Sequence, residues 1–184
     1  MIALWIILGV AALLIIFGIS AYNAIIRLQN KAEEASSGID VHLNKRYDLV
    51  PNLVETVKGY ATHEKEALER VVSARYAAMQ AKGFSEKEKA EGDFSRAIGS
   101  LFALGESYPD LKANANFLSL QEQLTEIETE IQNARKYYNA VARTFNDKIM
   151  AFPSNIIANM MKKTKLEYFT LSDEKKGERV EVKF

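Results

Sequence analysis

The residues with the clearest chemical potential lie in one short segment, His63-Glu64-Lys65-Glu66-Ala67. It begins like His-Glu-x-x-His, a helical motif in which two histidines one turn apart bind zinc and the glutamate acts as a base. The fifth position here is alanine, so the second of the two helical ligands is missing. The segment therefore excludes a zinc protease of this kind.

The two histidines of the chain also fail the pattern of a di-iron bundle. Such centres take Glu-x-x-His from each of two helices and one further glutamate from each of two others. Tyr60 stands three residues before His63, and Ile39 stands three residues before His42. We therefore interpret both histidines as polar residues at the edge of a helical seam.

Other common catalytic and binding patterns are missing as well. The chain has no cysteine, which excludes disulfides, a thiolate nucleophile and Cys-ligated zinc. None of its nine glycines forms a Gly-x-Gly or Gly-Lys-Ser/Thr phosphate-binding loop. Lys+Arg 24 balance Asp+Glu 24, so the chain has no net charge to attract a nucleic acid. We expect no metal, no cofactor and no nucleic-acid partner.

The elements that must position these residues begin with an apolar segment over residues 2–19, IALWIILGVAALLIIFGI. Its length matches the roughly 20 residues that a helix needs to cross a bilayer core. A cleaved signal peptide is the alternative, because Gly18 and Ser20 are small residues spaced as at a cleavage site. The run is longer than a signal core and no basic residue precedes it, so we favour a retained span that places residues 2–21 in the lipid bilayer.

The charges that flank the span predict its orientation. Arg27 and Lys31 follow the span, whereas only the amino terminus carries positive charge before it. Lysine and arginine are retained on the cytoplasmic side of bacterial membranes. We therefore expect a single-pass protein of the bacterial inner membrane, with its amino terminus outside and its body in the cytoplasm.

Beyond the span, apolar residues recur at helical spacings of three and four. The clearest series predicts a helix of roughly 35 residues, or about 55 Å, with a seam buried against neighbours. Its members are Phe117, Leu124, Ile131, Tyr138, Phe145 and Phe152, interleaved with Leu120, Ile127, Ala134 and Val141. Helices joined by short connections pack as antiparallel neighbours. We predict an all-α fold, an up-and-down antiparallel four-helix bundle preceded by an N-terminal transmembrane helix.

Two further features divide the middle of the chain. Lys82-Gly83 is typical of a helix end, and Ser85-Glu86-Lys87-Glu88 has the form of a capping box for a helix that begins near Glu86. Glu64 and Arg75 fall at seam-like positions before this boundary, so each needs a partner from another helix if it is buried. We favour a partly exposed seam for them.

The domain organisation follows from these elements. We assign residues 1–24 to the transmembrane helix, 25–171 to the helical bundle and 172–184 to a polar, flexible tail. The last residues, 179–184, alternate polar and apolar side chains, but they are too short to anchor a sheet.

The segment RYDLVPNLVETVKGY, residues 46–60, places Pro51 inside a helical pattern. Proline in a helix interior clashes with the carbonyl four residues earlier, here Tyr47, and costs about 3 kcal/mol or more, but it is tolerated in a first turn. One kinked helix therefore competes with a corner, in which Asp48 caps a new helix that starts at Leu49. We prefer the corner, because a rod of about 60 residues would reach about 90 Å and overshoot the long fourth helix.

The corner gives this segment a structural role and a candidate surface. Arg46 would close the helix before the corner, at the end of the bundle farthest from the membrane. Arg46, Asp48, Asn52 and Glu55 lack the nucleophile or ligand set of a catalytic centre. We predict that these four residues contact a protein partner.

A corner at Pro51 also returns the fourth helix to the membrane. It brings an apolar group and then a basic group near the inner leaflet, namely Ile156, Ile157, Met160 and Met161, followed by Lys162, Lys163 and Lys165. Apolar residues followed by lysines can lie in the interface and meet anionic lipid. We predict that the three lysines contact the membrane surface; a short helix packed on the end of the bundle is the alternative.

The segment RYDLVPNLVETVKGYATHEKE, residues 46–66, resembles the LemA family of bacterial membrane proteins. Matches follow in order along almost the whole chain: Tyr22-Asn23, Ile39-Asp40-Val41, Tyr108-Pro109-Asp110-Leu111-Lys112-Ala113-Asn114, Asn116-Phe117, Ala134-Arg135-Lys136-Tyr137-Tyr138-Asn139, Phe152-Pro153-Ser154-Asn155-Ile156-Ile157-Ala158 and Val180-Glu181-Val182-Lys183-Phe184. The resemblance implies one amino-terminal span, a bundle of the four-helix type and no established catalytic residue. Relatives are linked to membrane invagination around magnetosomes and, by gene neighbourhood, to membrane proteases.

Together these observations favour a non-enzymatic, membrane-anchored interaction or scaffold protein. Its partner would be an unidentified membrane protein or another copy of the chain. A self-assembling protein that shapes membranes is the first alternative, and an accessory partner of a membrane protease is the second. An enzyme that uses His63, Glu64 and Glu55 is the least favoured function.

Overall fold

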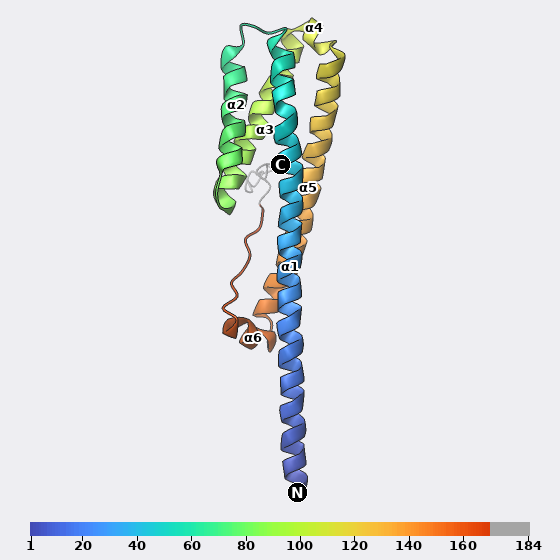
Figure 1. Cartoon of the computed structure of the whole chain (residues 1–184), viewed down its shortest axis with the longest axis vertical. Coiled ribbons are helices and arrows are strands. Elements are labelled where there is room, and N and C mark those ends of the chain that lie inside the picture. Colours follow the sequence, from blue (N-terminus) through green and yellow to red (C-terminus); the bar gives the residue numbers. More distant parts are fainter. Residues whose placement is uncertain (170–184) are drawn as a thin grey trace, which may run out of the picture. The chain divides into compact units, whose positions relative to one another are not determined.

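The computed structural model describes residues 1–169, so the predicted tail 172–184 and the alternating residues 179–184 lie outside the described residues. The described part is α-helical and contains no strand (Figure 1). Its helices are α1 (Ile2–Lys58), α2 (Lys65–Gln80), α3 (Phe84–Ser107), α4 (Pro109–Lys112), α5 (Ala115–Met150) and α6 (Ser154–Met160). The predicted all-α fold with a long apolar N-terminal helix is confirmed.

The chain divides into two compact units. Unit 1 comprises residues 1–39 and 133–168, and unit 2 comprises residues 40–132 and the described residue Phe169. Both long helices, α1 and α5, contribute one part to each unit.

Unit 2 is a bundle of four helical segments that alternate in direction. The segments are the carboxyl-terminal part of α1, then α2, α3 and the amino-terminal part of α5, with the short α4 before α5 (Figure 1). Its core side chains are Leu43, Val50, Leu53 and Val57 of α1, Leu68 and Val71 of α2, Phe94, Ile98 and Leu101 of α3, and Phe117, Leu124, Ile127 and Ile131 of α5. Aromatic contacts add to this packing, since the rings of Phe102 and Phe117 meet edge-on with centroids 5.9 Å apart.

The predicted corner at Pro51 is wrong. Helix α1 continues through Pro51 to Lys58, so Asp48 lies in a helix interior and is not an N-cap. The chain turns after Lys58, where the Ala61 amide donates to the carbonyl of Val57 at 2.9 Å. So long a helix is possible because roughly 20 residues of α1 form the apolar segment, which needs no partner helix in a membrane.

The start of α3 also differs from the prediction. The N-cap is Gly83, whose φ of 81° lies in the left-handed region that favours glycine, and the helix begins at Phe84. The predicted capping box is therefore not formed, since the helix starts before Ser85. Instead, the Glu86 carboxylate accepts a hydrogen bond from the Lys82 amide at 3.1 Å.

The long predicted helix is confirmed as α5, which has 36 residues. The Asn114 side chain precedes it and accepts a hydrogen bond from the Phe117 amide at 3.0 Å, which satisfies one free donor of the first turn. The last predicted seam residue, Phe152, was placed wrongly, because α5 ends at Met150 and the Phe152 side chain is 81% exposed.

Unit 1 joins part of α1 and the end of α5 to α6. Its core is a cluster of Ile25, Phe145, Ile149 and Ala158, against which Leu28, Ile157, Met161 and Leu166 pack. The Asn146 side chain fastens the segment after α6, since its amide group donates to the Leu166 carbonyl at 2.9 Å and its oxygen accepts from the Leu166 amide at 2.8 Å. The first part of α1 is long and apolar enough to cross a membrane, and none of its apolar window is buried within the described residues.

Candidate functional site

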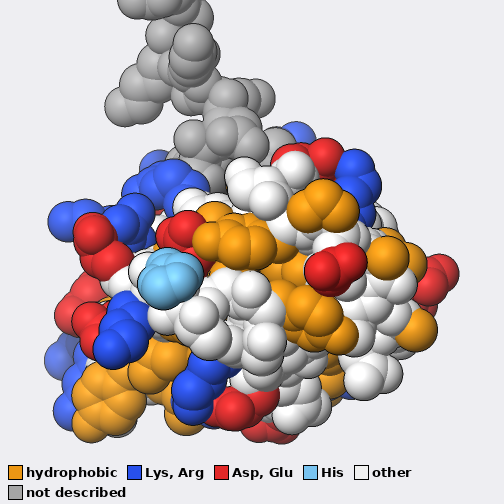
Figure 2. Space-filling view, turned by 90° about the horizontal axis from the view of Figure 1, so that it is seen from above, with side chains coloured by type: hydrophobic (Ala, Val, Ile, Leu, Met, Phe, Trp, Pro, Cys, Tyr) orange, Lys and Arg blue, Asp and Glu red, His pale blue; other side chains and the backbone are white. Residues whose placement is uncertain are grey.

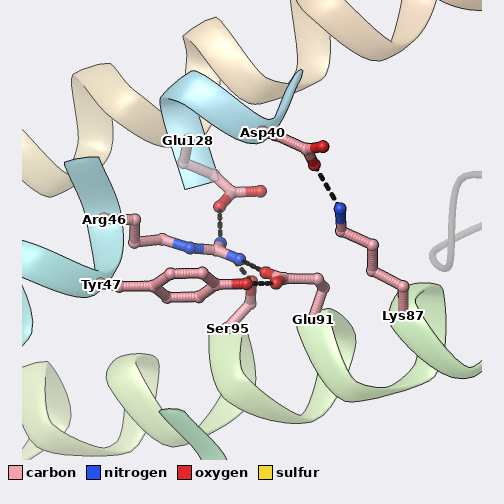
Figure 3. Close-up of polar contacts among 7 residues, drawn as sticks. All are labelled: Asp40, Arg46, Tyr47, Lys87, Glu91, Ser95 and Glu128. Carbon is pink, nitrogen blue, oxygen red and sulfur yellow. Dashed lines mark hydrogen bonds and ion pairs between the residues drawn. The ribbon is translucent and has the colours of Figure 1, made fainter. Parts of the chain in front are cut away.

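A buried polar network in unit 2 centres on Arg46 of α1, whose guanidinium contacts side chains of two other helices, α3 and α5 (Figure 3). One terminal nitrogen donates to Ser95 Oγ at 2.9 Å and to Glu128 Oε2 at 2.6 Å. The other terminal nitrogen donates to one carboxylate oxygen of Glu91, and the Tyr47 hydroxyl donates to the other. The network therefore ties α1 to both α3 and α5.

The two most buried charges of this network, Arg46 and Glu91, stabilise each other. Arg46 is 2% exposed and Glu91 is 1% exposed, so each ion is stable only because the other is present. The guanidinium carbon also lies 5.2 Å from the ring centroid of Phe94, which adds a cation–π contact. Glu128 is less buried, and its side chain reaches solvent through a groove of about 450 Å³ that Arg46 and Ser95 also line.

The hydrogen bonds and ion pairs of the network serve to hold helices together. Burial, followed by the hydrogen bond to Glu91, raises the pKa of Tyr47, so the phenol remains protonated and keeps its donor role. Both Glu91 oxygens already accept hydrogen bonds from charged or phenolic donors. These contacts hold the helices in register, which is the best attested use of buried ions.

Next to the network, Arg75 compensates for the proline in α1. Pro51 has no N–H to donate to the carbonyl of Tyr47, which would be its partner in a regular helix. Arg75 of α2 donates its Nε–H to this carbonyl instead, at 2.7 Å. The interhelical hydrogen bond explains how α1 continues through Pro51 without leaving the Tyr47 carbonyl unsatisfied.

The predicted partner surface is only partly assembled. Asp48, Asn52 and Glu55 are exposed on α1 at spacings of four and three, which places them on one face of the helix. Arg46 does not belong to this surface, because it is buried in the network.

The sequence analysis did not predict that Arg46 is buried, although the spacing of the buried residues of α1 indicates it. Residues 39, 43, 46, 50, 53 and 57 follow one another at alternating spacings of four and three, and all of them are buried. Arg46 is the polar member of this seam. Glu91 holds the same kind of position in α3, where residues 91, 94, 98, 101 and 105 are buried at alternating spacings of three and four.

An apolar groove lies beside the exposed face of α1. It has a volume of about 560 Å³ and is lined by Val54, Glu55 and Lys58 of α1, Thr62, and Lys65, Leu68, Glu69, Val72 and Ser73 of α2. Val72 is 52% exposed, and the apolar stripe continues along α2 through Tyr76 and Met79. Figure 2 shows the end of unit 2 that carries the α1–α2 turn, where acidic and basic side chains alternate with apolar ones.

The histidines and their neighbours form separate contacts. His42 Nδ1 lies 2.8 Å from Glu130 Oε2, whereas His63 is exposed in the turn before α2. Glu64 accepts a hydrogen bond from the Tyr108 hydroxyl at 3.1 Å, which raises the pKa of Tyr108. Within residues 1–169 no group of three or more histidines, aspartates and glutamates is placed to hold a metal ion.

The three lysines predicted to contact the membrane lie in unit 1 and differ in their exposure to solvent. Lys162 and Lys165 are exposed, whereas Lys163 is half-buried and donates to the Gln29 side chain. Helix α6, which precedes them, packs on α1, since a Cβ atom added at Gly18 would lie 3.9 Å from Cδ1 of Ile157.

Comparison with known proteins places the chain among bacterial relatives. The LemA family profile matches residues 35–184. "Protein LemA" of Metamycoplasma hominis is 29% identical, with a match that covers 87% of this chain and 72% of the relative. "Magnetosome protein MamQ" of Magnetospirillum gryphiswaldense and "Magnetosome protein MamQ 2" of Paramagnetospirillum magneticum are each 26% identical, with matches over 80% of this chain and 64% of the relative. The chain thus spans less than two thirds of the length of the MamQ proteins, and none of these names denotes an enzymatic activity.

Proposed function

The chain belongs to the LemA family, and from that membership we propose that it is a membrane-anchored, non-enzymatic interaction protein of the bacterial inner membrane. One observation carries the proposal: the buried charges serve to hold helices together, while an exposed polar face and an apolar groove lie side by side on α1 and α2. Such a surface is suited to binding a protein partner through an apolar centre and a polar rim.

The anchor in this proposal is the first part of α1. Among residues 1–169 no neighbour buries its apolar side chains, and exposed leucine, isoleucine and valine side chains are stable in lipid. Arg27 and Lys31 follow the span and favour a cytoplasmic location for the rest of the chain.

The contact surface in this proposal consists of Asp48, Asn52 and Glu55 together with the α1–α2 groove. Glu55 belongs to both, because it lies on the exposed face of α1 and lines the groove. Its salt bridge to Lys58 is exposed and long, at 3.5 Å, so either partner of the bridge is available to another protein at little cost.

Photocrosslinking in native membranes tests the proposal. A photoreactive residue at Asn52 or Glu55 of the full-length chain should give a discrete adduct of higher mass. The same residue at Glu126, an exposed position on α5, is the matched control and should give none. A membrane protease in the adduct would identify the chain as an accessory of that protease. Recovery of the monomer alone from every position would contradict a role in protein interaction.

Self-assembly is a second candidate function, and the exposed stripe on α2 favours it. Lys65, Glu69, Val72, Tyr76 and Met79 are spaced by four and three, as in the seam of a coiled coil. Two antiparallel copies of α2 centred on Val72 would place Tyr76 of one copy beside Glu69 of the other, within reach of a hydrogen bond. A membrane-shaping protein built from such pairs would curve a bilayer as its density rises.

A single cysteine tests this second function, because the chain contains no other cysteine. Val72→Cys should form a disulfide-linked dimer in membranes, whereas Ser100→Cys, exposed on α3, should not. Vesicles that contain the unmodified chain should change shape as protein density increases, and Val72→Glu should abolish this effect. Unchanged vesicles and absent dimers together would exclude self-assembly through α2.

A further inference from the structure

Helix α6 and the turn before it present an apolar face that no part of unit 1 covers. Ile156 and Met160 are spaced by four residues within α6, which places them on one side of the helix, and Phe152 lies in the turn before it. Their exposed fractions are 81%, 53% and 76%. A cluster of large apolar side chains in water is unusual for a protein surface and indicates a contact with something apolar.

The opposite face of α6 is fixed to the helix that carries the membrane span. Ala158 is 1% exposed and packs in the cluster with Ile25 of α1 and Phe145 of α5. Ile157 reaches further towards the amino terminus, where its Cδ1 atom is close to Gly18. α6 therefore contacts α1 between residues 18 and 25.

The position of these contacts along α1 gives the depth of α6. Gly18 lies within the apolar run, and Arg27 is the first charged residue after it. At 1.5 Å per residue, residues 18 to 25 cover about 10 Å of helix, which is comparable to the thickness of the interfacial layer beside the hydrocarbon core. An element attached there is level with the lipid headgroups.

The residues that follow α6 have the charge that such a position requires. Lys162 and Lys165 are exposed, while Lys163 is held by the side chain of Gln29. Interfacial helices combine a buried apolar face with basic residues that meet anionic headgroups. The apolar residues of α6 and the lysines that follow it therefore have the order and the position along α1 that a contact with lipid requires.

We propose that Phe152, Ile156 and Met160 insert among the acyl chains of the leaflet from which α1 emerges, with Lys162 and Lys165 at its anionic headgroups. The inference rests on the proposed membrane anchoring of the chain. The occupant of the apolar face is thus lipid, because the opposite face of α6 contacts the membrane-spanning helix at Gly18 through Ile157 and so holds the exposed face beside the bilayer.

Site-specific fluorescence on the full chain tests this inference, since any introduced cysteine is the single one present. Met160→Cys carries an environment-sensitive dye, and the protein is reconstituted in phosphatidylcholine vesicles with or without phosphatidylglycerol. Leu13→Cys, within the span, reports anchoring, and Met79→Cys, an exposed methionine of unit 2, is the matched control. Nitroxide groups on the lipid chains should quench most of the emission at positions 13 and 160 and leave position 79 bright.

Charge reversal distinguishes the contribution of the lysines to lipid binding from that of the apolar face. The double variant K162E/K165E should lose the additional quenching of the position-160 dye that phosphatidylglycerol produces. The variant K82E/K89E, which reverses two exposed lysines of unit 2, should retain it.

The outcomes distinguish the two proposals. Absence of quenching at position 13 would refute membrane anchoring itself. Quenching at position 13 without quenching at position 160 would overturn the lipid contact and leave the anchor intact. A position-160 dye protected from both lipid-attached and aqueous quenchers would mean that protein covers α6, and this result would also overturn the inference.

Discussion

Arg46 and Glu91 are two charged residues buried in the helical core of unit 2. Each occupies a seam position that an apolar residue fills elsewhere along α1 and α3. Ion pairs of this kind add little net stability, but the loss of one partner leaves the other buried and unpaired. The consequences of substitution should therefore depend on whether one charge or both are removed.

We expect Arg46→Met to lower the free energy of unfolding by about 3–5 kcal/mol, because Glu91 then loses its buried counter-ion. The double variant R46M/E91L removes both charges and should recover most of this loss. Arg96→Met is the matched control, since Arg96 pairs with Asp93 on the surface and is 73% exposed, and its effect should be close to zero. Denaturant unfolding of the solubilised full chain, followed by circular dichroism, measures all three. Equal losses for Arg46→Met and Arg96→Met would contradict a buried pair.

The buried phenol of Tyr47 gives a prediction for alkaline pH. Its pKa is raised in the folded state by burial and by Glu91, whereas an unfolded tyrosine titrates near pH 10. Above about pH 10 the unfolded chain therefore binds fewer protons than the folded chain, and the free energy of unfolding falls as pH rises. Tyr47→Phe should make this fall less steep. Tyr76→Phe, which removes an exposed hydroxyl from α2, is the matched control for the loss of a phenol.

The hydrogen bond from Arg75 to the Tyr47 carbonyl should be coupled to Pro51. Arg75→Met leaves that carbonyl without its donor, and we expect a loss of about 1–2 kcal/mol. In the background of Pro51→Ala, the new backbone N–H can take the carbonyl, so Arg75→Met should cost less. A double-mutant cycle in denaturant measures the coupling energy between the two positions. Additive effects would show that Arg75 does not compensate for the proline.

At the scale of the elements, two glycines of α3 should respond in opposite ways to alanine. A Cβ atom at Gly99 meets no atom of the described residues within 4 Å, so Gly99→Ala should stabilise α3 by up to about 1 kcal/mol. A Cβ atom at Gly105 would lie 3.1 Å from Cε1 of the buried Phe117 ring. Overpacking of this kind costs about 1–3 kcal/mol, so Gly105→Ala should destabilise the bundle despite its better helix propensity. Thermal unfolding of both variants decides the sign, and a gain for Gly105→Ala would mean that Phe117 can move.

The helices were predictable where one periodic pattern determines them. The series through Phe117, Leu124 and Ile131 predicted α5 almost to its ends, since its residues bury one face over many turns. The course of α1 at Pro51 depends on a donor from Arg75, and no local pattern reveals that contact. A proline penalty estimated for an isolated helix was therefore larger than the penalty in the bundle.

The part of the candidate surface that follows from helical spacing could be predicted from the sequence. Asp48, Asn52 and Glu55 are exposed on one face, as expected for residues three and four apart. The predicted corner places Arg46 on this surface, whereas its spacing along the continuous α1 places it in the buried seam. The pairing of Arg46 with Glu91 could not be predicted, because the sequence of α3 offers several acidic residues and gives no distance to α1.

At the scale of the whole molecule, orientation in the membrane is the prediction with the clearest readout. Arg27 and Lys31 favour a cytoplasmic body, so Glu126→Cys should resist a membrane-impermeant maleimide in intact spheroplasts and react after lysis. A cysteine inserted after Met1 should react before lysis and serves as the control. Labelling of position 126 in intact spheroplasts would reverse the proposed orientation.

The contact of Arg75 with the Tyr47 carbonyl makes the stiffness of α1 conditional on α2. With α2 in place, the turn of α1 around Pro51 has a donor for its free carbonyl. A partner that enters the α1–α2 groove and draws α2 away would remove this donor, and proline turns are where helices bend most readily. α2 thus limits the bending of α1 at Pro51. A partner that occupies the groove and displaces α2 would remove this limit.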